Sequence, residues 1–173
     1  TVVPTLSSAS GLGGAATAAT YDATRRGSLN RFIFGQDAHI NAGSTDASDK
    51  DRWYFVAPSK FLGNQASAYG GRLELTLASA SGDFASLNAD LHVLYLECST
   101  CAMHKGITLA MPASALPPFT GAEQRLSVPL TETGGWLKDP GNTLLPWTAP
   151  TQCELVEVLS GLTAVRILGD YTR

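Results

Sequence analysis

A series of short hydrophobic segments separated by glycine- and proline-rich turns constrains the fold of this chain most strongly. In residues 72–77, leucines alternate with polar residues, which is the two-residue period of a strand with one buried face. Comparable segments follow at 91–96, 107–111, 125–130 and 164–168. Many short strands with turn signals between them predict an all-β fold, an antiparallel β-sandwich or jelly roll.

One segment near the C-terminus has the pattern of a helix instead. Thr151, followed three residues later by Glu154, fits a capping box. Apolar residues then recur at the spacing of one helical face, at Leu155, Val158, Leu159 and Leu162. The sequence therefore predicts one short helix that packs across the strands and ends at Gly161.

The N-terminal segment differs in composition from the rest of the 173 residues. Residues 1–20 are mostly Ala, Gly, Ser and Thr and carry no charge. We therefore expect residues 1–25 to be a flexible leader or linker and residues 26–173 to be one domain. The alternative is that Val2 and Val3 lie along a sheet edge. Because the chain starts at Thr1, with neither an initiator Met nor a signal region, we expect a processed protein or a piece of a longer one.

Composition and motifs exclude several classes of function. The net charge is −3 and the Lys and Arg residues are scattered, which argues against a nucleic-acid partner. No apolar run reaches the roughly 20 residues of a membrane span. The carboxylates and the three histidines form no catalytic constellation, and no phosphate-binding loop occurs. We expect no enzyme activity, no catalytic residues and no cofactor, a structural calcium ion excepted.

A more specific pattern begins at residue 53. Residues 53–64 read WYFVAPSKFLGN, and Tyr69-Gly70-Gly71 then leads into the strand at 72–77. Further matches follow in order at 90–93, at 126–130 with Gly135-Trp136, and at 159–167 with Tyr171. This series, over about residues 50–173, resembles the laminin IV type A domain, also called the laminin B domain, of laminin chains and related matrix proteins.

The resemblance singles out nine residues with structural roles: Trp53, Pro58, Phe61, Leu62, Gly63, Tyr69, Gly70, Gly71 and Trp136. The proline fixes a turn after the aromatic strand, and the Phe-Leu pair supplies apolar anchors. The glycines allow a positive φ or a close backbone approach. The two tryptophans are expected in the core rather than as platforms for sugars.

The resemblance also implies a location and a role. It implies a non-enzymatic structural or adhesion module of a larger matrix, filament or cell-surface protein, either secreted or part of an ectodomain. Such a module acts through protein–protein contacts with other matrix proteins or with neighbouring modules of its own chain. The implied fold is a β-sandwich akin to carbohydrate-binding jelly rolls, so a lectin-like glycan-binding module is the alternative function.

The three cysteines allow two kinds of site. Cys98, Cys101 and His104, with the distant Cys153, are four residues of the types that bind zinc, but a second paired knuckle is missing. The extracellular location that the resemblance implies favours a disulfide instead. A Cys98–Cys101 ring and a link to Cys153 are both open. Because Cys153 lies just inside the predicted helix and Cys98 follows the strand at 91–96, we predict that Cys153 bonds to Cys98 or Cys101 and that one thiol stays free.

An acidic string in the polar loop at residues 37–51 is a candidate calcium site. Asp46, Asp49 and Asp51 would offer hard oxygen ligands of the kind that Ca²⁺ takes. Lys50 and Arg52 interleave with them, which is typical of a solvated surface. The solvated loop is the favoured interpretation.

Overall fold

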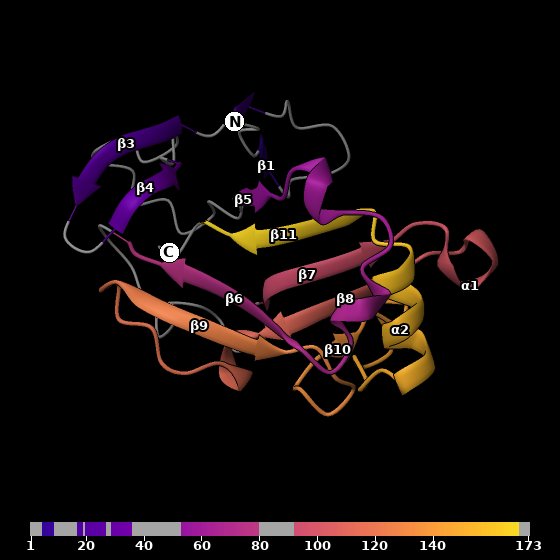
Figure 1. The fold of residues 1–173 in the computed structure, drawn as a ribbon. Coiled ribbons are helices and arrows are strands. Elements are labelled where there is room, and N and C mark those ends of the chain that lie inside the picture. The colour runs from indigo at the N-terminus through magenta and orange to yellow at the C-terminus, as the bar shows by residue number, and fades with distance from the viewer. Residues whose placement is uncertain are drawn as a thin grey trace.

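A computed structural model shows the arrangement of strands and helices (Figure 1). The residues it describes are 5–8, 17–18, 20–26, 29–35, 53–79 and 92–169. Their strands are β1 (Thr5–Ser8), β2 (Thr17–Ala18), β3 (Thr20–Arg26), β4 (Leu29–Phe34), β5 (Trp53–Val56), β6 (Arg72–Leu77), β7 (His92–Cys98), β8 (Ile107–Pro112), β9 (Gln124–Pro129), β10 (Leu137–Lys138) and β11 (Ala164–Leu168). Their helical segments are η1 (Ser59–Phe61), η2 (Ala66–Ala68), α1 (Cys101–His104), η4 (Ala113–Ala115) and α2 (Gln152–Ser160).

The described strands form one large sheet and two separate pairs. The large sheet has the order β10-β8-β7-β11-β5-β1-β2, and the pairs are β3–β4 and β6–β9. Every pairing is antiparallel. The predicted fold, mostly β with antiparallel sheets and a short helix near the C-terminus, is confirmed at this level.

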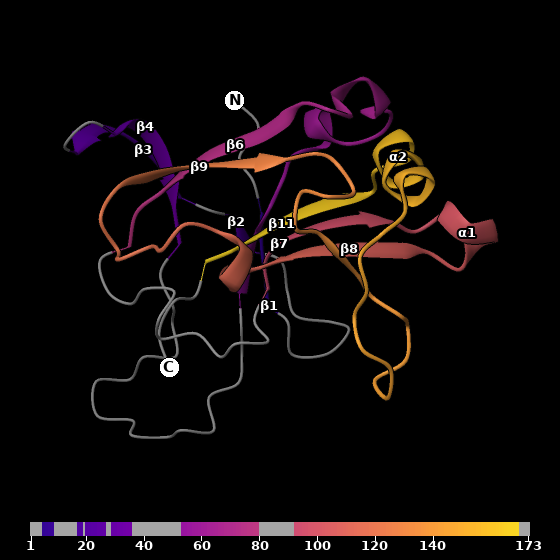
Figure 2. The ribbon, with the colours of Figure 1, turned by 90° about the horizontal axis from the view of Figure 1, so that it is seen from below.

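The core lies between the large sheet and the elements that cover one of its faces. In both ribbon views, β6 and β9 lie over the large sheet, and α2 lies on the same side beside β7 and β8 (Figures 1 and 2). In β9, Leu126 and Val128 are buried, whereas Arg125, which directly precedes Leu126, is exposed. This alternation is the two-residue period of a strand. The core is completed by side chains of β7, β8 and α2, among them Leu94, Leu96, Leu109, Leu155 and Leu159.

Helix α2 begins as the sequence predicts. The Thr151 hydroxyl accepts a hydrogen bond from the Glu154 backbone N–H (3.3 Å), and the Glu154 carboxylate accepts one from the Thr151 N–H (2.8 Å). The capping box is therefore formed in both directions. The Lys138 ammonium also contacts the Glu154 carboxylate at 2.6 Å, which ties β10 to the helix. The predicted apolar face is buried, at Leu155, Val158, Leu159 and Leu162.

Replacing Glu154 by Gln should lower the free energy of unfolding by about 1 kcal/mol near pH 7. The hydrogen bond from Lys138, and then that from the Thr151 backbone, hold the pKa of Glu154 below its usual 4.5. A lowered pKa in the folded state means that this stabilisation is present above pH 4.5 and is lost as pH falls through the folded-state pKa. Urea unfolding of both proteins between about pH 7 and pH 3 should show the difference shrinking as pH falls. A stability difference that stays constant over this pH range would contradict the stabilising role assigned to the Glu154 carboxylate. Lys138→Met is the matched second variant.

The Tyr-Gly-Gly turn connects η2 to the β6–β9 pair. Gly70 has φ +79°, and its N–H donates to the Leu130 carbonyl (3.1 Å). The Leu130 N–H donates in return to the Gly71 carbonyl (3.0 Å). A Cβ on Gly71 would lie only 2.9 Å from the backbone carbonyl oxygen of Ala68. Gly70 thus has the expected positive φ, and Gly71 has the expected close backbone approach.

The variant Gly71→Val should lower the free energy of unfolding by more than about 1 kcal/mol, because its Cβ would push against backbone that cannot move aside cheaply. Ser67→Ala, at an exposed position of η2, is the control and should change stability by less than about 0.5 kcal/mol. Thermal and urea unfolding of both variants provide the comparison. An unchanged melting temperature for Gly71→Val would show that the contact with Ala68 does not constrain the turn.

The N-terminal strands differ from the flexible leader that composition predicts. Strand β1 pairs with β5 from Thr5↔Val56 to Ser8↔Trp53, and β3 crosses the predicted boundary at residue 25. Pairing joins backbone groups and needs no run of apolar side chains, so a Ser- and Thr-rich strand leaves no hydrophobic period in the sequence. The point at which the folded domain begins stays a prediction. Val2 and Val3 lie outside the described residues.

Candidate functional site

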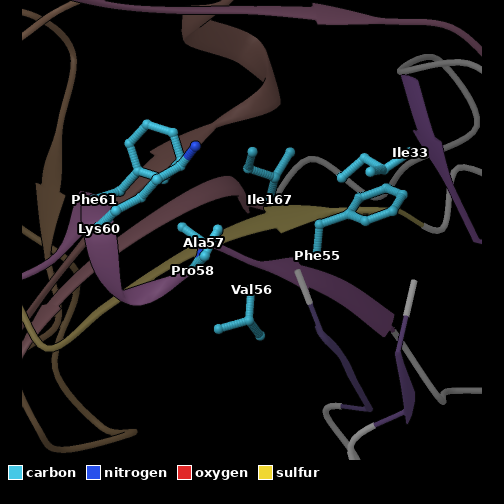
Figure 3. A pocket seen from close by; sticks show the side chains of 8 residues that line it. All are labelled: Ile33, Phe55, Val56, Ala57, Pro58, Lys60, Phe61 and Ile167. Carbon is cyan, nitrogen blue, oxygen red and sulfur yellow. The ribbon is translucent and has the colours of Figure 1, made fainter. Parts of the chain in front are cut away.

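An open apolar groove of about 250 Å³ lies where β4, β5, η1 and β11 come together (Figure 3). It is lined by Ile33, Phe55, Val56, Ala57, Pro58, Lys60, Phe61 and Ile167. Phe55 and Ile167 are direct partners across the β5–β11 pairing, so their side chains share one face of the sheet. Figure 3 shows them together with Ile33 on one side, while Val56 points the other way.

The segment after β5 forms one wall of the groove. Pro58 precedes η1 with φ −65°, and its carbonyl accepts a hydrogen bond from the Phe61 N–H (2.9 Å). This tight turn directs the side chains of Phe61 and Leu62 in different directions. Leu62 packs against the core, as expected, whereas Phe61 is 51% exposed. Phe61 is thus not a core anchor but part of the groove.

Exposed apolar surface and the cation of Lys60 give the groove its chemistry. Ile33 is 36% exposed and lies in the lining with Phe61. The Lys60 ammonium lies 4.8 Å from the centroid of the Phe61 ring, close enough for a cation–π contact. Among the described residues that line the groove, Lys60 is the one charged residue, and no acid, histidine or cysteine lies beside it. These residues can bind an apolar group but offer no pair of groups for acid–base or nucleophilic chemistry.

The two tryptophans of the family pattern differ in burial. Trp136 is 1% exposed, and its Nε1–H donates to the Pro129 carbonyl (2.7 Å), so its predicted core position is confirmed. Trp53 is half-buried and packs edge-on against Phe55, with ring centroids 5.0 Å apart. Its ring also lies so close to Gly169 that a Cβ there would collide with it.

Tyr69 of the family pattern links two turns. Its hydroxyl donates to the Glu132 carboxylate at 2.7 Å. This hydrogen bond is the main reason that the pKa of Tyr69 is raised and the pKa of Glu132 is lowered. The contact holds the Tyr-Gly-Gly turn against the segment that follows β9, so the role of Tyr69 here is to position backbone.

The cysteine pairing corrects the prediction. Cys98 and Cys101 form the disulfide, with Cα atoms 5.5 Å apart, and Cys153 is an exposed free thiol. The predicted bond to Cys153 is therefore wrong. Cys153 lies two residues before the buried Leu155, so it is rotated by about 200° away from the side of the helix that faces the sheet. The disulfide consumes two of the three thiols of the candidate zinc set, which leaves only exposed His104 and exposed Cys153 of its four residues.

A left-handed turn that the sequence did not indicate directly follows the disulfide. Ala102, Met103 and His104 have φ values of 50°, 55° and 67°, a conformation that residues other than glycine rarely adopt. The Ala102 N–H donates to the Glu157 carboxylate (2.8 Å), and Cys101 Sγ lies 3.4 Å from the Glu157 carbonyl oxygen. The turn is thus fixed by the disulfide on one side and by α2 on the other.

Replacing Cys98 and Cys101 together by Ser should lower the free energy of unfolding by about 2 kcal/mol, the value that loop entropy gives for so short a ring. Cys153→Ser is the control and should leave stability nearly unchanged, because that side chain is exposed. Urea unfolding measures both effects. Alkylation of the denatured, unreduced protein should label one thiol, and labelling of three would show that the disulfide is absent.

The calcium candidates Asp46, Asp49 and Asp51 lie outside the described residues, so that site stays a prediction. Within the residues that the structure does describe, no group of three or more His, Cys, Asp or Glu side chains is arranged to hold a metal ion. No helix in the same part of the chain is long and apolar enough to cross a membrane.

The antiparallel sheets, the Cys98–Cys101 disulfide and the apolar groove together define a β-rich module. The family model described as Laminin B (Domain IV) matches residues 54–173, and the chain belongs to this family of non-catalytic modules. The fold is similar to that of the L4b domain of human laminin alpha-2, with a TM-score of 0.57 and 17% sequence identity. This likeness covers 70% of the present chain and 62% of that one, less than two thirds of its length. No curated protein matches the chain.

Proposed function

We propose that this domain is a structural or adhesion module of a larger extracellular matrix, filament or cell-surface protein, and that it acts through protein–protein contacts at the apolar groove. The family supplies the extracellular matrix context. The observation that carries the proposal is the exposure of Phe61 and Ile33 at the two ends of one groove lining, with Ile167 between them (Figure 3). A cluster of exposed large apolar side chains is typical of a contact surface.

The groove suits a protein partner better than a sugar. A glycan site presents several convergent hydrogen-bonding groups, whereas Lys60 supplies the one charged side chain among the lining residues that the structure describes. The groove volume of about 250 Å³ also lies below the range of about 300–1,000 Å³ that is common for small-molecule sites. One or two apolar side chains of a partner would fill it. Other matrix proteins and neighbouring modules of the parent chain are the proposed partners.

The finer description of the fold and location belongs to the same proposal. The stacking of β6–β9 over the large sheet supports a β-sandwich of the jelly-roll type, akin to carbohydrate-binding modules. The Cys98–Cys101 disulfide supports a secreted protein or an ectodomain, because such bonds persist in oxidising compartments.

Binding of the domain to extracellular matrix deposited by cultured cells tests the proposed function. Phe61→Ser should weaken binding by at least about tenfold, since it removes an aromatic contact from the groove. Met103→Ser is the matched control, because Met103 is 93% exposed but lies in α1, away from the groove lining. Far-ultraviolet circular dichroism checks that both variants are folded.

Treatment of the matrix separates the two kinds of partner. Loss of binding after mild proteolysis of the matrix, with retention after enzymatic removal of glycans, supports protein–protein contact. The reverse result would establish the lectin-like alternative and overturn the proposal. Equal binding by wild type and Phe61→Ser would show that the groove is not the contact surface.

A further inference from the structure

A second exposed apolar feature lies far from the groove, in the loop between β10 and α2. We call residues 139–147 the leucine loop. Leu144 is 89% exposed and Leu145 is 55% exposed, so the loop presents two adjacent leucines to solvent. In the view from below, this orange segment projects beyond the large sheet, on the side away from β6 and β9 (Figure 2). Neither leucine contributes to the core cluster.

Hydrogen bonds at its base and along its length give the leucine loop a defined shape. Lys138 and Thr148 pair as an antiparallel bridge at the base, with N···O distances of 2.6 and 3.3 Å. The Asp139 carboxylate accepts from the Gly141 N–H (2.8 Å). The Asn142 side chain accepts from the Leu144 N–H (2.9 Å). The leucines are thus presented by turns rather than by packing, and little conformational freedom remains to be lost on binding.

The leucine loop cannot reach the groove of its own molecule. Strands β8, β7 and β11 separate β10 from β5 in the sheet, a distance of about 19 Å at the usual strand spacing. The groove lining belongs to the β5 side of the sheet, while the loop leaves from β10 at the opposite edge. Any contact between the two must therefore join separate copies.

Size and charge match between the two features. An apolar cavity of about 150 Å³ holds a benzene molecule, so a groove of about 250 Å³ has room for one or both leucine side chains. The loop carries one charged residue, Asp139, and the described part of the groove lining carries one of opposite sign, Lys60. Opposite charges flanking apolar patches orient the two surfaces as they meet.

We propose that the leucine loop of one copy docks into the apolar groove of a second copy of this chain, with Leu144 and Leu145 filling it and Asp139 near Lys60. This inference rests on the proposed function, because it assigns a partner to the same groove. Loop and groove are different surfaces, so the contact is head-to-tail and leaves one loop and one groove unused at the ends of every open assembly. The small size of the two patches places it among weak contacts.

Sedimentation velocity and equilibrium of the purified chain test the proposal, at concentrations up to about 1 mM. The wild type should show an average mass that rises steadily with concentration. Phe61→Ser, which lacks the groove contact, and Leu144→Ser/Leu145→Ser, which lacks the loop contact, should each remain monomeric. Met103→Ser is the control and should associate as the wild type does.

Mixing the two defective variants is the decisive measurement. Phe61→Ser retains an intact loop and the double leucine variant retains an intact groove, so an equimolar mixture should form one-to-one dimers that grow no further. A symmetric contact between like surfaces would give no such recovery and would overturn the proposal. A wild type that stays monomeric over the whole range, or variants that associate unchanged, would overturn it as well.

These outcomes are separable from those of the matrix-binding experiment. If the wild type is monomeric while matrix binding still depends on Phe61, the groove takes another protein and only the self-association is wrong. If self-association depends on Phe61 and on the leucines but matrix binding does not depend on Phe61, the contact between copies stands without the wider adhesion role.

Discussion

The insertion of β11 between β5 and β7 is the pairing on which the rest of the structure depends. Arg166 pairs with Val56 on one side and with Tyr95 on the other, so the last described strand joins the N-terminal and the middle parts of the chain. Without β11, β5 and β1 would have no backbone connection to β7 and β8 in the large sheet. The same pairing places Ile167 opposite Phe55 and so forms the floor of the groove. Fold stability and the candidate site therefore share one set of hydrogen bonds.

Helix α2 packs against this sheet and in turn holds β10 and the turn that follows the disulfide. Its buried face covers the sheet, its first turn is held by Lys138, and its Glu157 fixes the left-handed turn that follows the disulfide. Lys138 is also the first residue of the bridge at the base of the leucine loop. The loop is therefore anchored to the core through one short chain of contacts, although its tip makes no contribution to that core.

Local patterns were sufficient for the parts of the fold that carry a period or a cap. Strand β6 was predicted at its observed bounds because its leucines alternate, and α2 was predicted because Thr151 and Glu154 satisfy each other's backbone groups. Features that depend on tertiary contacts left no such signal. Strand β1 has no hydrophobic period, and cysteine connectivity cannot be deduced from spacing.

The candidate site was only partly predictable, for a related reason. The family pattern identified Phe61 and Leu62 as apolar, but a pattern of residue types does not distinguish a side chain that enters the core from one left outside. That choice is made by the turn after Pro58, which sends Leu62 inward and leaves Phe61 exposed. The leucine loop escaped sequence reasoning as well, because Leu144 and Leu145 look like core residues until the turns around them are known.

A weak head-to-tail contact has a physical advantage in a protein built of several modules. Two copies held by the same filament or matrix meet at a high effective concentration, so a contact that is negligible between free domains becomes populated without any additional interface. Because each copy offers one loop and one groove, occupancy at one surface leaves the other open, and an open assembly can grow at both of its ends. The exposure of Phe61, Leu144 and Leu145 costs each free domain some unfavourable hydration, and docking removes that apolar surface from water on both partners at once. The driving force of assembly is then the same hydrophobic burial that forms the core, applied between copies rather than within one.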